Sequence, residues 1–263
     1  MQNLASMIKE KKLFLLDIDG TVALGSELLP GAAEFLYTVK ENGGICRFLT
    51  NNSSKAARDY VEQFHDWGIE TTEDEFITAG TYARDFMKKY YGNEKILVAA
   101  TETYCNELRK AGLNITDQAG DDVDCVLCAY DTELTYEKLV QVCKQLTETN
   151  VPWFATNPDL RCPIDFGMVP DCGSICRMIT ASVGREPEYI GKPAPGMVYA
   201  CLEETGCTPK QTLLIGDRIY TDMECGKRAG VDSCLVLTGE ANAEEWKNGF
   251  QCQSLGKLAG YFS

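Results

Sequence analysis

The sequence predicts an α/β protein in which a parallel-sheet core is interrupted by an inserted, smaller α/β domain. Short apolar segments alternate with longer amphipathic segments along the 263-residue chain. This order is typical of a parallel sheet with helices on both faces. The alternation starts afresh in the middle of the chain, and the length is sufficient for one large domain or two modest ones.

The first third of the chain supplies two expected strands and three expected helices. The strands are 13–17 and 45–50, and the helices are 31–42, 54–67 and 78–91. Gly43 and Gly44 end the first helix, and Ser53 or Ser54 caps the second. Both strands are apolar runs that lead into polar residues, so polar side chains are expected at their carboxyl ends.

The middle of the chain repeats this order in a separate unit. The expected strands are 95–100, 123–130 and 151–156, and the helices between them are 101–111 and 135–147. We therefore place an inserted α/β domain at residues 81–187, between core segments at 1–80 and 188–263. The core resumes with a helix at 193–205, a strand at 213–216, a helix at 221–229 and a strand at 233–237.

The charge balance excludes several classes of partner. Thirty-nine acidic residues against 25 basic ones give a formal net charge of −14. Nucleic acids and anionic membrane surfaces need a clustered basic face, so neither is an expected partner. No apolar run reaches the roughly 18 residues that a membrane-spanning helix needs. A small anion held by a local cation and one or two lysines is compatible with this balance.

Thirteen cysteines allow three interpretations. A disulfide framework would imply secretion, but the N-terminus lacks the apolar segment of a signal peptide. A zinc site is suggested only by Cys125 with Cys128 and by Cys172 with Cys176. Cys125 and Cys128 fall on an expected buried strand, where positions three apart point to opposite faces, which opposes chelation. Small buried side chains in a reducing cytoplasm are the favoured interpretation.

Polar clusters follow several of the expected core strands. They are Asp17 with Asp19, Thr50 with Asn51, Lys192, and Asp217 with Asp222. Ligands of an open parallel sheet bind at the carboxyl ends of the strands, so these side chains are expected at one sheet edge. The carboxylates suit a hard divalent cation, and the lysine and the Thr50 hydroxyl suit a phosphoryl group. Gly20 permits close backbone approach, so that amides near it can donate to the same oxygens.

Each cluster taken alone also fits an ordinary structural role. Asp19–Gly20 is a common turn pair, and Thr50 and Asn51 are of the types that cap a helix. Lys192 alone is typical of a solvated surface, and Asp222 alone of a first helical turn. The convergence of all four clusters on one sheet edge favours a functional site.

Four motifs in this order resemble those of the haloacid dehalogenase superfamily. They are DIDGT (17–21), LTNNS (49–53), GKP (191–193) and GDRIYTD (216–222). The long insert, with TNPD (156–159) and CGSIC (172–176), resembles the large α/β cap of the NagD-type, nitrophenylphosphatase-like branch. The resemblance covers nearly the whole chain and implies a Rossmann-like core with an inserted cap domain.

The resemblance also implies roles for the matching residues. Asp17 corresponds to the nucleophile that becomes an aspartyl-phosphate, and Asp19 to the general acid and base. The implied phosphate-binding residues are Gly20, Thr50, Asn51 and Lys192, and the last of these is also catalytic. The implied Mg²⁺ ligands are Asp17, the Asp19 backbone carbonyl, Asp217 and, directly or through water, Asp222.

The insert contributes candidate specificity residues by the same resemblance. Asn157, Asp159 and Asp165 lie in the polar segment TNPDLRCPIDFG (156–167), where the family places contacts to the substrate. His65, the only histidine, lies at a helix end and is expected to be at the surface or partly packed. A histidine phosphatase or a Ser–His–Asp hydrolase is therefore disfavoured.

The expected activity is Mg²⁺-dependent hydrolysis of a small phosphorylated metabolite, such as a sugar phosphate or a nucleotide, by a cytoplasmic enzyme that is a monomer or a homodimer. A non-catalytic phosphate-binding module, such as a receiver domain phosphorylated on aspartate, is the alternative. The acid–base Asp19 and the cap favour hydrolysis. A dehalogenase or phosphonatase is disfavoured because Asp19 suits protonation of an oxygen leaving group.

Overall fold

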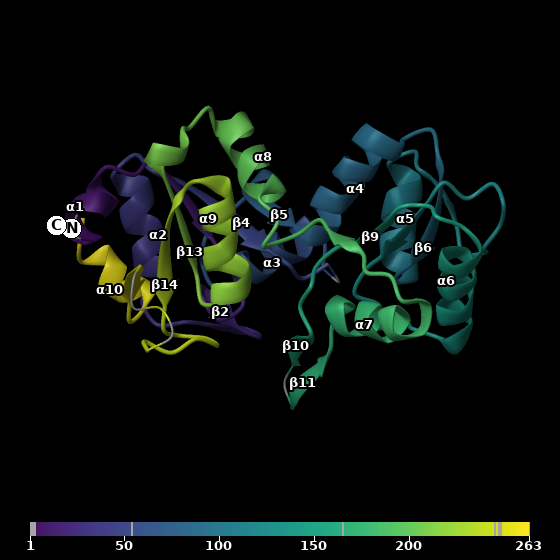
Figure 1. The fold of residues 1–263 in the computed structure, drawn as a ribbon. Helices are drawn as coiled ribbons and strands as arrows, with labels where there is room; N and C mark the ends of the chain where they lie inside the picture. Colours follow the sequence, from purple (N-terminus) through teal and green to yellow (C-terminus); the bar gives the residue numbers. More distant parts are fainter. Residues whose placement is uncertain (1–3, 54, 165, 245, 247–248, 263) are drawn as a thin grey trace. The chain divides into compact units, whose positions relative to one another are not determined.

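The computed structural model describes residues 4–53, 55–164, 166–244, 246 and 249–262 (Figure 1). The chain divides into two compact units. The core unit consists of Met1–Thr50, Ala57–Ile77 and Lys192–Ser263, and the inserted unit of Asn51–Ala56 and Thr78–Gly191. The short segment Asn51–Ala56 therefore packs with the inserted unit, although it follows a core strand directly.

The core unit is built on a six-stranded sheet in the order β15-β14-β13-β1-β4-β5. The strands are β1 (Leu13–Leu16), β4 (Ile45–Thr50), β5 (Phe76–Thr78), β13 (Thr212–Gly216), β14 (Asp232–Val236) and β15 (Phe250–Cys252). The pairs from β15 to β4 are parallel, and Leu16 lies opposite both Ile215 and Phe48. The carboxyl ends of β1, β4 and β13 therefore lie next to one another at one edge.

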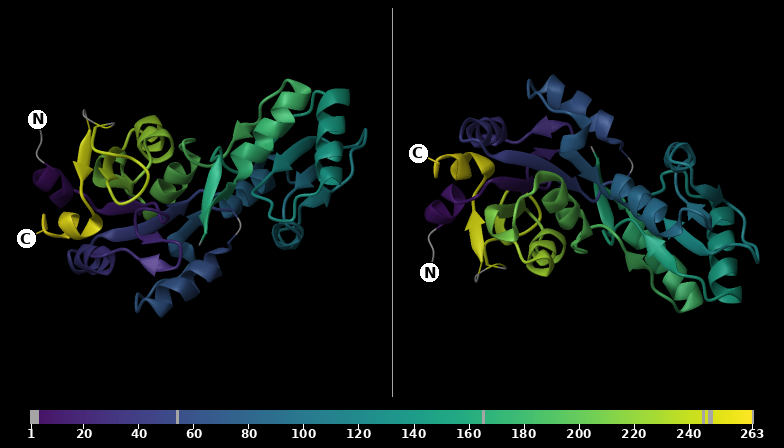
Figure 2. Two further views of the ribbon diagram at one scale, coloured as in Figure 1. Left: turned by 90° about the horizontal axis from the view of Figure 1, so that it is seen from below. Right: turned by 90° about the horizontal axis from the view of Figure 1, so that it is seen from above.

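Helices cover both faces of the core sheet (Figure 1). Phe14 and Leu16 pack in one buried cluster with side chains of α1 (Leu4–Lys9), α2 (Ala32–Glu41), α3 (Ala57–Asp66) and α10 (Leu255–Ala259). Side chains alternate along a strand, so Leu13 and Leu15 face the other side. There lie α8 (Gly196–Thr205) and α9 (Glu224–Ala229), the latter with Gly226 against Leu214. Figure 2 shows α1 and α10 side by side in both views.

The inserted unit has a parallel sheet of its own, in the order β12-β9-β8-β6-β7. The strands are β6 (Lys95–Ala99), β7 (Asn114–Thr116), β8 (Cys125–Cys128), β9 (Trp153–Ala155) and β12 (Glu188–Tyr189). Helices α4 (Ala79–Tyr91) and α5 (Glu102–Lys110) pack on one face, and α6 (Tyr136–Glu148) and α7 (Cys172–Val183) on the other. An antiparallel hairpin, β10 (Arg161–Ile164) and β11 (Gly167–Pro170), leads from β9 to α7.

The remaining elements are short. They are the hairpin β2 (Ala23–Leu24) and β3 (Glu27–Leu28), the 3₁₀ turns η1 (Glu73–Glu75) and η2 (Pro209–Gln211), and the π-helical turn η3 (Ile219–Met223). Apart from η3, which overlaps the helix expected at 221–229, none of them was predicted, because segments this short carry no readable periodicity.

The predicted α/β class, with a parallel sheet in the core, is confirmed. Two local predictions are wrong. The helix expected at 221–229 is the π-helical turn η3 followed by α9, because a wider turn does not follow the 3.6-residue period. Ser53 does not cap α3, which begins at Ala57; its hydroxyl instead accepts a hydrogen bond from the Tyr130 amide. Ser54 lies outside the described residues.

The cysteines behave largely as small buried side chains. No disulfide joins them in the structure, and eleven of the thirteen are buried. Cys125 and Cys128 belong to two different core clusters, on opposite faces of β8, as predicted. Among the described helices, none is both long enough and apolar enough to cross a membrane.

Candidate active site

Three carboxylates of the core unit meet beyond the carboxyl ends of β1 and β13. Asp17 follows β1, Asp217 follows β13, and Asp222 belongs to η3. Each offers an oxygen within 4.8 Å of the others, and all three side chains are buried. Like charges this close destabilise the ionised state unless a cation lies among them.

Lys192 supplies one such cation. Its Nζ donates to Asp17 Oδ1 at 2.5 Å, to Asp222 Oδ1 at 2.7 Å and to the Leu49 carbonyl at 2.8 Å. The side chain is almost completely buried. Burial alone would lower the pKa of this ammonium, but Asp17 and Asp222 outweigh it and raise the pKa. Lys192 is therefore charged at neutral pH and holds two carboxylates in fixed positions.

Asp222 is anchored by the π-helical turn. The Arg218 amide donates to Asp222 Oδ2 at 3.0 Å, while Oδ1 accepts from Lys192. Gly216 makes room for it, because a Cβ on Gly216 would lie 2.3 Å from the Asp222 Cγ. Burial raises the pKa of Asp222, and Lys192 works against that shift. The turn thus brings this carboxylate inward instead of leaving it on a helix surface.

Asp217 is the carboxylate of this cluster whose negative charge is offset least by neighbouring groups. Its Oδ2 accepts a hydrogen bond from the Glu240 amide at 2.7 Å. Its Oδ1 is buried and has no hydrogen-bond partner among the described residues. Burial, with the charges of Asp17 and Asp222, raises the pKa of Asp217 to about 8. A buried oxygen of this kind fits the coordination of a hard divalent cation such as Mg²⁺.

The turn after Asp17 packs closely against the Asp217 carboxylate. Gly20 has φ +96°, a conformation that favours glycine, and a Cβ there would lie 2.5 Å from Asp217 Oδ2. The Gly20 amide donates to the Ala23 carbonyl at 2.7 Å, and its carbonyl accepts from the Thr238 hydroxyl at 2.6 Å. In the structure, Gly20 therefore allows the Asp217 carboxylate to pack closely against this turn. Asp19, in the same turn, is partly exposed.

Several residues that shape this site were not among the candidates predicted from the sequence. They are Gly216, Thr238, Gly239 and Glu240. A Cβ on Gly239 would lie 2.0 Å from Asp217 Oδ2, so this glycine admits the carboxylate just as Gly20 does. The segment TGE (238–240) begins two residues after the end of β14. The rule that sites form at the carboxyl ends of strands could have identified it.

The other residues singled out in the sequence are the predicted phosphate-binding and specificity residues and the one histidine. Thr50 is buried and ends β4, while Asn51 belongs to the inserted unit and donates from Nδ2 to Asp159 Oδ2 at 2.8 Å. Asn157 and Asp159 are only 0% and 1% exposed. Asp165 lies outside the described residues. His65 is exposed on α3, as expected.

Two family models match the chain in succession. A haloacid dehalogenase-like hydrolase model matches residues 14–114, and a HAD-hydrolase-like model matches residues 189–255. An acid sugar phosphatase from Staphylococcus epidermidis is 29% identical over 238 residues, covering 90% of this chain and 91% of the relative. The 5'-nucleotidase YutF from Bacillus subtilis is 30% identical over 237 residues, again covering 90% and 91%.

Solved structures resemble the whole chain. A 4-nitrophenylphosphatase from Thermotoga maritima has a TM-score of 0.90 and 37% identity, covering 98% of this chain and 99% of that one. NagD from E. coli K-12 has a TM-score of 0.84 and 28% identity, with coverages of 94% and 98%. A glycerol phosphate phosphatase from Mycobacterium tuberculosis, in complex with magnesium, has a TM-score of 0.86 and 26% identity, with coverages of 98% and 78%.

Proposed function

Since the chain belongs to the haloacid dehalogenase-like hydrolase family, in its NagD-like branch, we propose that it is a Mg²⁺-dependent phosphomonoester hydrolase. Its substrate would be a small phosphorylated metabolite, such as a sugar phosphate or a nucleotide. The acid sugar phosphatase and 5'-nucleotidase among its relatives support this class of substrate. The reaction would pass through an aspartyl-phosphate on Asp17.

The observation that carries this proposal is the charge balance of the buried cluster. Asp17, Asp217 and Asp222 can bring three negative charges, and Lys192 supplies one positive charge. A divalent cation would offset the remaining two. The buried Asp217 Oδ1 supplies a ligand atom for it, and the magnesium complex of a related phosphatase supports the choice of metal.

The proposed reaction assigns one task to each residue. Asp17 attacks phosphorus, and the ammonium of Lys192 keeps its carboxylate ionised and in place. Asp19 protonates the leaving oxygen and then takes a proton from the water that cleaves the aspartyl-phosphate. Thr50, Asn51 and Lys192 would hold the phosphoryl oxygens. Asp17, Asp217, the Asp19 carbonyl and Asp222 would hold Mg²⁺, which supplies positive charge to the phosphoryl group when bound.

The direct test is phosphate release by the purified protein in Mg²⁺. We expect hydrolysis of 4-nitrophenyl phosphate and of some members of a panel of sugar phosphates and nucleotides. A receiver-like module would instead become phosphorylated by a small phosphodonor without catalytic turnover. No phosphate release from any ester in the panel would overturn the proposal.

Residues 81–187 of the inserted unit are proposed to act as a cap that sets substrate preference without taking part in the chemistry. Contacts remote from the reacting phosphate change the binding of the leaving group, whereas the charge of the transition state is handled by the core. The cytoplasmic location and the monomeric or homodimeric state both remain predictions from the sequence.

Metal removal is expected to abolish activity. In excess chelator, phosphate release should fall by about 10²-fold or more, because the cation offsets charge worth several kcal/mol in the transition state. Readdition of Mg²⁺ should restore the rate, and circular dichroism should show that the chelated protein stays folded. Full turnover in chelator would contradict the proposed metal dependence.

A single methyl group at Gly239 is expected to displace the metal ligand Asp217. Gly239→Ala should lower kcat/KM by about 10²-fold, the typical cost of a misplacement of about 1 Å, and should raise the Mg²⁺ concentration needed for half-maximal activity. Gly260→Ala is the matched control. Gly260 is the C-cap of α10, with φ −62°, and among the described residues its added Cβ would meet only the Lys257 carbonyl, at 3.5 Å. Equal activity of the two variants would refute this role for Gly239.

A further inference from the structure

The segment Asn51–Ala56 follows the last residue of β4 and is bound into the inserted unit by polar contacts. Ser53 Oγ accepts from the Tyr130 amide at 3.2 Å and lies 3.2 Å from the Thr156 hydroxyl. Its Cβ would lie 3.5 Å from a Cβ added to Gly80 at the start of α4. The segment is therefore fixed at Ser53 and cannot shift without breaking buried hydrogen bonds.

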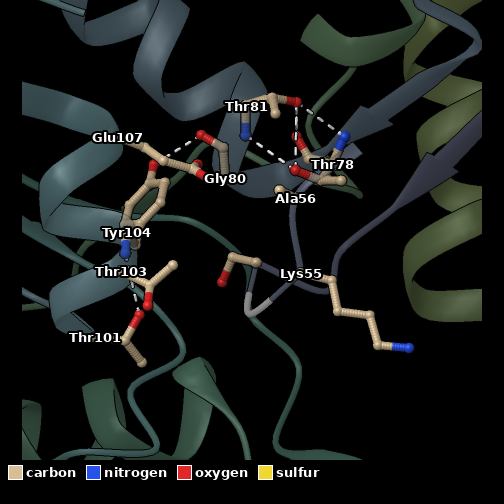
Figure 3. A pocket seen from close by; sticks show the side chains of 10 residues that line it. Lys55, Ala56, Thr78, Gly80, Thr81, Thr101, Thr103, Tyr104 and Glu107 are labelled. Atoms are coloured by element: carbon tan, nitrogen blue, oxygen red, sulfur yellow. Dashed lines mark hydrogen bonds between the residues drawn. The ribbon is translucent and has the colours of Figure 1, made fainter. Parts of the chain in front are cut away.

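A small cavity of about 10 Å³ lies between this segment and the starts of α4 and α5 (Figure 3). In Figure 3 the Tyr104 hydroxyl points to the Gly80 carbonyl, to which it donates at 2.7 Å. The Lys55 side chain extends away from these groups. The cavity holds no more than a water molecule. It is therefore too small for a ligand, and the segment packs closely against the starts of α4 and α5.

Asp159 fixes the other end of the segment. Its Oδ2 accepts from Asn51 Nδ2 at 2.8 Å and from Asn157 Nδ2 at 3.3 Å. Asn157 also donates to Asp171 Oδ1 at 3.1 Å, and Asp171 caps α7 through the Cys172 amide. A buried chain of hydrogen bonds thus runs from Asn51 to the start of α7. A hydrogen bond to a buried carboxylate is among the stronger kinds.

We propose that Asp159 is a positioning residue for phosphate binding and that it acts through the carboxamide of Asn51. This inference rests on the proposed function, in which Asn51 holds a phosphoryl oxygen. Asn51 is joined directly to Thr50, the last residue of β4. At 1% exposure, Asp159 binds Asn51 and Asn157 rather than a substrate. Its loss therefore weakens the binding of every phosphate ester alike, whatever the leaving group.

A double-mutant cycle tests whether Asp159 acts on phosphate binding through Asn51. Asn51→Ala, Asp159→Ala and the double variant are compared with wild type for KM and kcat on 4-nitrophenyl phosphate and on one sugar phosphate. The dissociation constant of inorganic phosphate is measured by calorimetry in Mg²⁺. We expect Asp159→Ala to weaken phosphate binding about 10-fold, and equally for both esters. In the Asn51→Ala background the same substitution should change binding less than about 2-fold, because residues in one hydrogen-bond network are not additive.

Two further variants separate positioning from stability. Asp159→Asn keeps an acceptor oxygen for Asn51 and should restore most of the binding; it also serves if the alanine variant fails to fold. Asp131→Ala is the matched control. Asp131 is another buried aspartate of the inserted unit, bonded to the Glu133 amide at 2.9 Å and to Lys138 Nζ at 2.7 Å. It should lower the melting temperature and leave phosphate binding unchanged.

The outcomes are distinct for the two proposals. If wild type hydrolyses no ester, the proposed function fails, and the phosphate dissociation constants still decide whether Asp159 acts through Asn51. Independent effects of the two alanine substitutions, an effect confined to one ester, or a loss no larger than that of Asp131→Ala would overturn the positioning role. Absence of phosphate binding by wild type would overturn it as well.

Discussion

Asp17→Asn is expected to lower turnover by about 10⁴-fold or more on every substrate, because an amide is a poor nucleophile and cannot form the aspartyl-phosphate. Asparagine has nearly the same shape as aspartate, and its oxygen can still accept from Lys192, whose Nζ lies 2.5 Å from Asp17 Oδ1. The loss should therefore be chemical. Phosphate release measures it directly, and acid quenching of the enzyme with labelled substrate should trap phosphate on wild type and not on the variant.

The melting temperature distinguishes this loss of turnover from misfolding. The substitution removes the charge of one of three clustered buried carboxylates, of which Asp17 and Asp222 pair with Lys192, so it relieves repulsion in the metal-free protein. In excess chelator the melting temperature of Asp17→Asn should not fall below that of wild type. Asp232→Asn is the control, because Asp232 pairs with Lys11 at the opposite, amino end of β14; it should retain normal turnover. Wild-type rates for Asp17→Asn would show that Asp17 is not the nucleophile.

The core of the site could be predicted because its residues obey a general rule of parallel sheets. Asp17, Thr50 and Asp217 each end or follow a buried apolar strand, and the carboxyl ends of neighbouring parallel strands meet at one edge. The structure brings the carboxylates of Asp17, Asp217 and Asp222 together with Lys192. The strand order accounts for Asp17, Thr50 and Asp217, whereas the roles of Lys192 and Asp222 were expected from the family motifs GKP and GDRIYTD.

Other features depend on contacts that no local pattern encodes. Gly239 and Gly216 matter because of what lies opposite them, Asp217 and Asp222, and a glycine in a sequence gives no sign of its neighbours. Ser53 has the composition of a helix cap but bonds to Tyr130, 77 residues away. Asn157 and Asp159 lie in a polar segment typical of a surface loop and are buried, because each finds buried hydrogen-bond partners.

Asp19→Asn is the substitution whose effect should depend most on the leaving group. A sugar alkoxide is strongly basic and needs a proton as the phosphorus–oxygen bond breaks, and a general acid of this kind typically contributes about 10²–10⁴-fold. A nitrophenolate is stable without a proton. Formation of the aspartyl-phosphate should therefore slow by about 10²-fold or more with a sugar phosphate and only mildly with 4-nitrophenyl phosphate. The backbone carbonyl of residue 19, the proposed metal ligand, is unchanged by the substitution.

Hydrolysis of the aspartyl-phosphate should slow for both esters, because the attacking water then lacks its base. Rapid-quench kinetics of Asp19→Asn with 4-nitrophenyl phosphate should show a burst of nitrophenol close to one equivalent per site, followed by slow turnover, with phosphate retained on Asp17. Wild type under the same conditions should show a smaller burst or none. Asp19 is partly exposed in its turn, while Asp17 and Asp217 beside it are buried, so it is the carboxylate of this group with access to a leaving group and to water. Equal slowing of the first step for both esters, without a burst, would mean that Asp19 supports the turn or the metal and does not transfer protons.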